Sequence, residues 1–394
     1  KLDKKLVFTP RVKRFFVILA LAVIASYIVY IATQYRVNLG VVLPLVLSFA
    51  LSFLLEKAKF KAYEKSARKK LALMPELKII MITASFGKTS IKNFLFELLK
   101  NDFVCRKTPR SVNTLAGLIQ DINNELAAGT QIYIAEAGAR LKGDIAQITE
   151  FLNPQIAIVG EIGAQHIEYF KTLENIRATK LEALSSKRLE KAFVHSSTQA
   201  NEGEKIEIYD RDLNGVEASL DGIKFKLGKR EFASPLLGKF NAANLAVCVK
   251  TALYLGLDEA RIASALARLK NVEHRLERID AGGKIIIDDG FNGNFNGMSA
   301  SYELVAGYEG RKVLVTPGIM ESSDEENEKL SKIINKTFDI VMLTSSLNAV
   351  ALLKHLSRPK VIVIKDKSKM QEALAQNTKA GDFILFSNDA PSFM

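Results

Sequence analysis

Two long apolar runs without charged residues open the chain. They cover residues 15–33 and 37–55, and only Gln34, Tyr35 and Arg36 separate them. Each run has 19 residues, close to the roughly 20 that a helix needs to cross a bilayer. The pattern predicts a transmembrane helical hairpin. A helical hairpin buried in a soluble core is the alternative, and a signal peptide fits less well because a second apolar run follows at once.

Beyond residue 70 the pattern changes to short apolar runs that alternate with helical periodicity. Runs at residues 78–83, 131–138 and 155–163 are typical of buried strands, and each precedes a helical stretch. This alternation predicts an α/β fold with a parallel sheet and helices on both faces. Residues 192–235 carry shorter strand-like runs with turn signals, which predict an antiparallel appendage. A second α/β unit starts near Lys284.

Three domains follow from this pattern. We expect a membrane hairpin with basic flanks at residues 1–70, a central domain at residues 71–278 and a C-terminal domain at residues 279–394. The chain has 394 residues, of which 48% are hydrophobic and 25% charged. That composition excludes a disordered chain, a collagen and a polytopic transporter.

The positive charge of the chain is local. Its net charge is +12, of which residues 1–14 and residues 56–70 contribute +5 each and Arg36 contributes +1. About +1 remains for the rest of the chain, so we expect no nucleic-acid surface there. Basic flanks at both outer ends of the hairpin place both ends in the cytoplasm. They also predict contact with anionic lipid of the membrane. The two cysteines, Cys105 and Cys248, are too few for a disulfide framework.

A phosphate-binding loop is predicted between the run at residues 78–83 and the helical stretch after it. A strand, a loop of small residues, a Lys-Thr pair and a helix follow one another there, as in P-loop proteins. Lys88 would neutralise the β- and γ-phosphates of ATP and Thr89 would bind Mg²⁺. The predicted phosphate-binding residues are Ser85, Phe86, Gly87, Lys88, Thr89 and Ser90. Ala84 stands where a strict pattern has glycine, so the loop alone leaves open a plain strand-to-helix turn with a solvated lysine.

Six motifs together resemble the ATP-dependent Mur ligases of bacterial cell-wall synthesis, in the order and spacing of that family, from about residue 79 to 320. The motifs are ITASFGKTS, EAGARLKGDI, EIGAQHIEYFKTLENIRATKLEAL, GKFNAANLAV, HRLE and IDDGFNGNFNGM. The resemblance implies a central P-loop-type ATPase domain followed by a Rossmann-like C-terminal domain. The stretch at residues 290–294 is similar to the branch that adds D-alanyl-D-alanine to UDP-N-acetylmuramoyl-tripeptide. Other branches have a lysine at the position of Phe291.

The resemblance implies a catalytic site with ATP and two Mg²⁺ ions. Lys88, His166 and Lys180 would be the catalytic residues. Thr89 and Glu136 would hold the ion bound to ATP, while His166 and Lys180 would hold the second ion. Lys180 would carry a carbamate, which turns its amine into a carboxylate-like ligand.

The resemblance also implies the nucleotide and substrate contacts. The nucleotide-binding residues would be Asn241, Asn244, His274, Arg275 and Asp289, with Asp288 as the less favoured acid. The substrate-side residues would be Asn113, Asn292 and Asn294. Phe240 replaces a histidine that is common in the family, a difference that we expect to alter packing rather than chemistry.

The implied reaction is ATP-driven amide formation through an acyl phosphate, with UDP-N-acetylmuramoyl-tripeptide and D-alanyl-D-alanine as substrates. One feature departs from the family, because the hairpin and its basic linker stand where relatives carry a domain that binds uridine diphosphate. Two alternatives therefore stay open. One is an amide ligase that acts on a lipid-linked muropeptide, and the other is a non-catalytic scaffold for cell-wall synthesis enzymes. The expected location is the bacterial inner membrane, with the catalytic domains in the cytoplasm.

Overall fold

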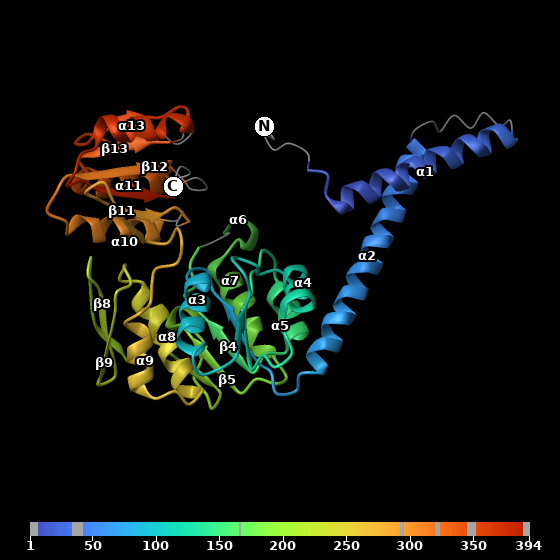
Figure 1. Ribbon diagram of the computed structural model, residues 1–394, viewed down its shortest axis with the longest axis horizontal. Coiled ribbons are helices and arrows are strands. Elements are labelled where there is room, and N and C mark those ends of the chain that lie inside the picture. The colour runs from blue at the N-terminus through green and yellow to red at the C-terminus, as the bar shows by residue number, and fades with distance from the viewer. Residues whose placement is uncertain are drawn as a thin grey trace. The chain divides into compact units, whose positions relative to one another are not determined.

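The structure is a computed structural model that describes residues 7–33, 42–164, 167–291, 293, 295–319, 324–344 and 352–388. The chain divides into two compact units (Figure 1). One unit comprises Lys1–Pro75 with Ala116–Ala128, and the other comprises Glu76–Leu115 with Gly129–Met394. The expected split of the second unit at residue 278 stays a prediction. Strand β10 (Glu277–Ala281) runs across that position.

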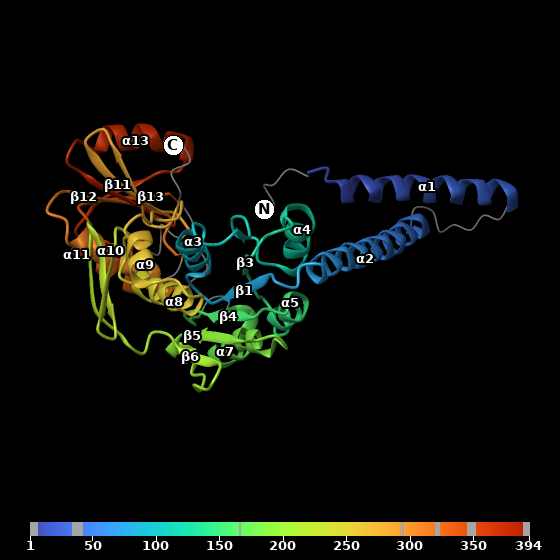
Figure 2. The same ribbon diagram turned by 60° about the horizontal axis from the view of Figure 1, so that its bottom comes forward.

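Helices form the first unit. They are α1 (Pro10–Thr33), α2 (Val42–Ala72) and α4 (Leu115–Glu125). Helices α1 and α2 pack against each other (Figure 2), and an ion pair joins Arg14 to Glu56 across them. The ammonium of Lys70 donates to the carbonyls of Ile122 (2.8 Å) and Asn123 (3.1 Å). The basic end of α2 is thereby fixed to the end of α4.

The expected hairpin is tested in part. Among the described residues, α1 is the one helix that is long and apolar enough to cross a membrane, and none of its apolar stretch is buried. This exposure argues against the alternative of a hairpin in a soluble core. The expected turn at residues 34–36 and the start of the second apolar run lie outside the described residues. The basic segment at residues 56–70, expected as a linker, continues α2 without interruption.

A six-stranded parallel sheet forms the centre of the second unit, in the order β2-β3-β1-β4-β5-β6. Its strands are β1 (Lys78–Thr83), β2 (Cys105–Lys107), β3 (Ile132–Glu136), β4 (Ile156–Val159), β5 (Lys191–Val194) and β6 (Ile206–Ile208). Alternate residues of β1, β3 and β4, such as Ile80, Ile134 and Ile158, share one apolar core with α3, α8 and α9. The expected parallel sheet is confirmed. Helices α3 (Lys88–Leu99), α8 (Asn241–Tyr254) and α9 (Glu259–Leu266) cover this face.

The other strand positions point to the opposite side, as the two-residue period of a strand requires. There Thr149 of α5 (Asp144–Leu152) contacts the sulfur of Met81 in β1. Helix α5 in turn contacts α7 (Leu173–Leu181), which the short helix α6 (Ile167–Phe170) precedes. Within the part of the second unit that the structure describes, short 3₁₀ helices lie at Glu182–Ser185, Ser196–Thr198 and Lys367–Lys369.

An antiparallel sheet follows the central sheet. It consists of β7 (Leu213–Ser219), β8 (Gly222–Leu227) and β9 (Arg230–Ser234). The sequence predicted this appendage for residues 192–235, and the first part of that range is wrong. Strands β5 and β6 pair in parallel with the central sheet, so the appendage begins at Leu213.

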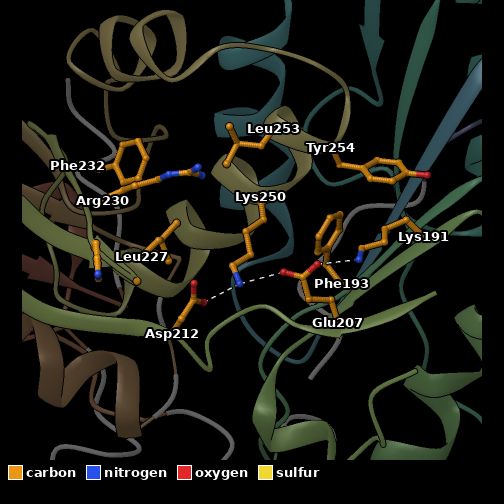
Figure 3. Close-up of a pocket in the computed structure, with 12 residues that line it drawn as sticks. Lys191, Phe193, Glu207, Asp212, Leu227, Arg230, Phe232, Lys250, Leu253 and Tyr254 are labelled. Carbon is orange, nitrogen blue, oxygen red and sulfur yellow. Dashed lines mark hydrogen bonds and ion pairs between the residues drawn. The ribbon is translucent and has the colours of Figure 1, made fainter. Parts of the chain in front are cut away.

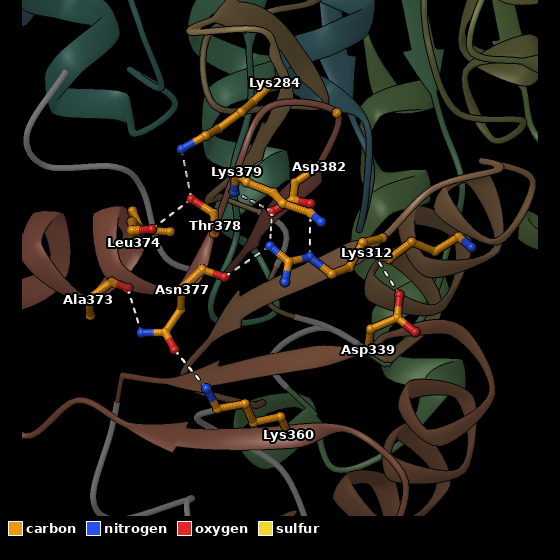
Figure 4. Close-up of polar contacts among 12 residues, drawn as sticks. Lys284, Lys312, Asp339, Lys360, Ala373, Leu374, Asn377, Thr378, Lys379 and Asp382 are labelled. Atoms are coloured by element: carbon orange, nitrogen blue, oxygen red, sulfur yellow. Dashed lines mark hydrogen bonds and ion pairs between the residues drawn. The ribbon is translucent and has the colours of Figure 1, made fainter.

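A second six-stranded sheet completes the fold, in the order β10-β11-β15-β12-β13-β14, with only β10 antiparallel. Its remaining strands are β11 (Lys284–Asp289), β12 (Lys312–Thr316), β13 (Ile340–Leu343), β14 (Lys360–Val363) and β15 (Phe383–Ser387). Its helices are α10 (Phe295–Ala306), α11 (Asp324–Thr337) and α13 (Met370–Asn377). Where β12 and β15 begin, Arg311 pairs with both carboxylate oxygens of Asp382 (Figure 4), at 2.9 and 2.6 Å. This ion pair fixes the start of β12 to the start of β15.

Candidate nucleotide and metal site

The loop between β1 and α3 has the geometry of a phosphate-binding turn. Gly87 has φ +79°, and a Cβ atom there would lie 2.5 Å from Oδ1 of Asn244. Glycine is therefore required both by the backbone conformation and by the close approach of α8. The N–H groups of Ser85 and Phe86 point to the carbonyl of Glu161. The first turn of α3, at Lys88–Ser90, is the part of the predicted loop that offers a helix N-terminus to an anion.

Lys88 is turned onto its own loop. Its ammonium donates to the carbonyls of Ala84 (2.7 Å) and Ser85 (3.1 Å). Burial lowers the pKa of Lys88 to about 8, with Arg275 acting in the same direction and Glu136 against it. Lys88 thus lies close enough to both residues to respond to their charges. A bound phosphate would add an anionic partner to the loop carbonyls that this ammonium contacts.

Glu136 ends β3 and is the centre of a polar cluster. Its side chain is 1% exposed. One carboxylate oxygen accepts from Thr89 Oγ1 at 3.0 Å and lies 3.1 Å from the ammonium of Lys92. The other oxygen accepts from Nδ2 of Asn113 at 3.2 Å. The structure thus brings together the two residues that the resemblance implied for the ATP-bound ion.

Two findings at this cluster add to the sequence interpretation. The side chain of Asn113, expected on the substrate side, contacts Glu136, and its contact with substrate stays a prediction. Lys92 was not expected in the site at all. A signal for it existed, because Lys92 lies one helical turn after Lys88 and beside Ile91 and Leu95 on the apolar side of α3. A lysine within a buried stripe indicates a buried partner.

Lys180 lies on α7 and is 3% exposed. Burial lowers its pKa to about 7, and the charge of Lys88 lowers it further, while Asp144, Glu136 and Glu182 act in the opposite direction. Lys180 therefore belongs to the same electrostatic environment as Lys88 and Glu136. His166, expected beside it as a metal ligand, lies outside the described residues.

The predicted asparagine pair is also brought together. Asn241 and Asn244 are buried on α8, and Nδ2 of Asn244 donates to Oδ1 of Asn241 at 2.9 Å. Asn241 in turn donates to the carbonyl of Leu237 at 2.8 Å. The contact of Asn244 with Gly87 places this pair directly against the phosphate loop. Their contact with adenine stays a prediction.

The segment between α9 and β11 supplies the last predicted nucleotide contacts. A ring nitrogen of His274, Nδ1, lies 2.6 Å from a carboxylate oxygen of Asp288, and this hydrogen bond raises the pKa of His274. Burial lowers the pKa of Arg275, and the nearby carboxylates of Asp289 and Glu136 oppose that effect. Arg275 thus extends the cationic side of the site.

The two acids of β11 have different partners. The carboxylate of Asp289 is 1% exposed and accepts from Ser301 Oγ and from the backbone N–H of Leu276. The role of Asp289 at the ribose stays a prediction.

The stretch after β11 is described only in part. Phe291 is 61% exposed, and its ring centroid lies 4.8 Å from that of His274. Asn292 and Asn294 lie outside the described residues.

A separate pocket of about 590 Å³ is lined by Lys250, Leu253 and Tyr254 at the C-terminal end of α8 (Figure 3). Its floor holds Lys250 between Glu207 and Asp212, at 3.0 and 2.6 Å, and Lys191 also pairs with Glu207 at 2.8 Å. None of the predicted site residues lines it. This pocket is therefore distinct from the phosphate loop.

Comparison with known proteins agrees with this geometry. Family models described as the Mur ligase middle domain and the Mur ligase glutamate ligase domain match residues 82–252 and 274–388. The UDP-N-acetylmuramoyl-tripeptide–D-alanyl-D-alanine ligase of Bacillus subtilis is 27% identical over 331 residues, which cover 78% of this chain and 72% of the relative. The ligase of the same name from Borreliella burgdorferi is 26% identical over 315 residues, which cover 74% and 64%.

Solved structures of Mur ligases have a similar fold. A MurF ligase from Thermotoga maritima, solved in complex with ADP, has a TM-score of 0.72 and 27% identity, and the match covers 84% of this chain and 80% of that one. A MurF from Acinetobacter baumannii, at 20% identity and a TM-score of 0.71, shares the fold over 84% and 78%.

Proposed function

The chain belongs to the Mur ligase family, and from this premise we propose that it joins D-alanyl-D-alanine to UDP-N-acetylmuramoyl-tripeptide at the expense of ATP. The observation that carries the proposal is the contact of Thr89 with Glu136 beside Lys88, at the carboxyl ends of adjacent parallel strands. A hydroxyl, a carboxylate and a buried cation in this arrangement suit a Mg²⁺-bound triphosphate. The names of the relatives in Bacillus and Borreliella support the choice of substrates.

The reaction requires two anions to meet. The tripeptide carboxylate attacks the γ-phosphate of ATP, ADP leaves, and an acyl phosphate forms. The amine of D-alanyl-D-alanine then attacks the acyl carbon, and phosphate leaves as the amide forms. Lys88 and Arg275 would lower the repulsion in the first step, because their half-buried charges are screened less than charges in bulk water.

The residues present fit Mg²⁺ at the first metal position. Thr89 Oγ1 and the Glu136 carboxylate are hard oxygen ligands, and Mg²⁺ prefers such ligands together with phosphate oxygens. When bound, Mg²⁺ would neutralise charge on the triphosphate and polarise its phosphorus.

A second ion would be held by His166 and a carbamate on Lys180. The burial of Lys180 supports the modification, since a buried amine with a pKa of about 7 is largely neutral at pH 8. Only the neutral amine adds carbon dioxide. The carbamate would then put an anion in place of the neutral amine beside the metal. Mass spectrometry of the intact protein after trapping of the carbamate should show the added group on Lys180.

A membrane anchor is the third part of the proposal. Helix α1 exposes its apolar residues along its length, and the second half of α2 is rich in lysine and arginine. An apolar helix with adjoining basic residues suits a bilayer with anionic lipid headgroups. The proposed location is therefore the cytoplasmic side of the bacterial inner membrane, near other cell-wall synthesis enzymes.

The function is tested with the full chain in lipid nanodiscs. Phosphate release from ATP should require both UDP-N-acetylmuramoyl-tripeptide and D-alanyl-D-alanine, and chelation of Mg²⁺ with EDTA should abolish it. Lys88→Met should lose at least about a hundredfold in rate because the charge beside the phosphates is gone. Lys187→Ala, which changes an exposed lysine, should keep the rate.

Other results would change the proposal. Release that requires a lipid-linked muropeptide in place of the UDP-linked one would move the substrate to the membrane. ATP binding without release under every condition would contradict a ligase and favour a scaffold.

A further inference from the structure

A second buried lysine faces the candidate metal ligand. Lys92 lies on α3 with its side chain 1% exposed, and its ammonium is 3.1 Å from the Glu136 carboxylate, which is equally buried. The same ammonium donates to the backbone carbonyl of Arg110, in the loop between β2 and α4. Neither the proposed mechanism nor the predicted site uses this lysine. Its position therefore calls for its own explanation.

Because both side chains are buried, the loss of either Lys92 or Glu136 should lower the stability of the fold. A carboxylate that is removed from water needs a compensating charge, and removal of one member of a buried pair leaves the other uncompensated. Thr89 and Asn113 are neutral donors, so they satisfy hydrogen bonds of Glu136 without balancing its charge. The charge of Glu136 is balanced at contact distance by Lys92.

The same contacts fasten a loop around Glu136. The backbone N–H of Glu136 donates to Thr108 Oγ1 at 3.3 Å, and the N–H of Gly138 donates to the carbonyl of Asn113 at 2.7 Å. With the bond from Lys92 to Arg110, the loop at residues 108–113 is tied to β3 and α3 at several points. The orientation of the Glu136 carboxylate is thus coupled to the position of this loop.

We propose that Lys92 is the resident counter-charge of the metal site, a positioning residue that holds the Glu136 carboxylate oriented before Mg²⁺ arrives. A carboxylate offers about four lone-pair positions. Thr89, Lys92 and Asn113 take three of them, which leaves one for a metal. The site is in this way preorganised without its ion, and Mg²⁺ adds to the pair rather than replacing it. The inference rests on the proposed function only for the identity of the metal.

The test asks whether loss of Lys92 makes the fold depend on Mg²⁺. Cys248 is fully buried in the core that α3 and α8 share, so its reaction with a fluorescent maleimide on heating reports unfolding there. The full chain in detergent micelles would carry Cys105→Ser to leave this one thiol. Wild type should gain less in Tm from MgCl₂, relative to NaCl of equal ionic strength, than Lys92→Met gains, because Lys92 already balances Glu136. Lys92→Met should unfold at least about 5 °C lower, and MgCl₂ should restore at least half of that loss.

Two further variants separate the charge from the packing. Glu136→Gln removes the carboxylate that balances the charge of Lys92, so the Tm of this variant should fall and MgCl₂ should not restore it. The double variant Lys92→Met with Glu136→Gln has no unbalanced charge and should recover a Tm near that of wild type without MgCl₂. This double variant also decides the case if Lys92→Met alone fails to fold.

The outcomes are distinct from those of the ligase assay, since none depends on turnover. A Tm of Lys92→Met equal to that of wild type would overturn the proposal. A lowered Tm that neither MgCl₂ nor Glu136→Gln corrects would overturn it as well, because Lys92 would then act through packing alone.

Discussion

Gly87 lies in the phosphate loop where the loop packs against helix α8 and leaves no space for a side chain. Its φ is +79°, and an added Cβ would meet Asn244 at 2.5 Å. We expect Gly87→Ala to lower the affinity for Mg²⁺-ADP at least about tenfold, since strain in the left-handed region and the clash both displace the loop. Binding of a fluorescent ADP analogue measures this.

Gly129→Ala is a matched control for that substitution. Gly129 has φ +86° and no heavy atom within 4 Å of an added Cβ. It therefore shares the backbone strain, about 1 kcal/mol, and lacks the clash. Equal losses of ADP affinity in both variants would show that Asn244 plays no part.

His274 predicts a pH dependence of stability. Its hydrogen bond with Asp288 raises its pKa above the usual 6.5. A raised pKa in the folded state means that the pair stabilises the fold fully below pH 6.5 and loses this effect as pH rises through the folded-state pKa. The advantage of wild type over His274→Gln should be below about 1 kcal/mol at low pH and vanish at high pH.

Thermal unfolding between about pH 5.5 and pH 9 measures this difference. Asp288→Asn keeps a hydrogen-bonding side chain and removes the charge. The difference in Tm between wild type and this variant should therefore also shrink as pH rises. A difference between wild type and His274→Gln that grows with pH would contradict the assignment.

At the residue scale, the sequence predicted the candidate metal ligands better than it predicted the residues that contact them. Thr89 and Glu136 follow motifs at the ends of strands, and the structure brings them together. Lys92 was missed because a lysine in an amphipathic helix ordinarily faces water, and nothing local shows that Glu136 lies opposite. The contact of Asn113 with Glu136 was not predicted either, since the two residues are 23 positions apart in the chain.

At the scale of elements, charge was a poor guide to where a helix ends. The sequence interpretation placed a basic linker after the apolar run at residues 37–55, whereas α2 continues to Ala72. Lysine, glutamate, alanine and leucine are strong helix formers, so polarity changes along α2 while helix propensity does not. Strands β5 and β6, with four and three residues, were too short for their pattern to separate parallel from antiparallel pairing.

Helix α1 gives a prediction at this scale. Leu21 and Ile24 lie near its middle and are 61% and 56% exposed. The double substitution Leu21→Arg and Ile24→Arg should release the protein from membranes, because each arginine at the centre of a bilayer costs about 2.5–3.5 kcal/mol. Alkaline carbonate extraction of membranes, followed by immunoblotting, measures the released fraction.

The control for that experiment lies on α2. Phe60→Arg and Tyr63→Arg add the same two charges to the basic half of α2, which is already polar. This variant should stay in the membrane pellet. If the α1 variant stays there too, α1 does not cross the bilayer.

At the scale of the molecule, the candidate site and the apolar helices belong to different units. All described site residues lie within Glu76–Leu115 and Gly129–Met394. We expect Mg²⁺-ADP to slow hydrogen exchange in peptides that cover the phosphate loop, β3 and α7 of the full chain, since ligand binding suppresses local opening. Peptides from α1 and α2 should exchange as before. Protection in α2 on ADP binding would contradict this separation.

The overall fold was largely predictable because α/β proteins repeat a simple pattern. Buried parallel strands give continuous apolar runs such as that of β1, and both sheets were expected on this basis. The pattern carries no information on strand order, which places β1 between β3 and β4 and so brings Thr89 to Glu136. Contacts of that kind depend on pairing between distant segments.

Helix α2 is a single rod of 31 residues, about 46 Å at 1.5 Å per residue. Under the proposed attachment to a bilayer, this tether would confine the enzyme to a thin layer and reduce its search for neighbours from three dimensions to two. Encounter rates would then follow the number of enzyme molecules per area of membrane rather than per volume of cytoplasm. A cell could therefore sustain the supply of precursor at a growth zone with few copies, provided that they gather there.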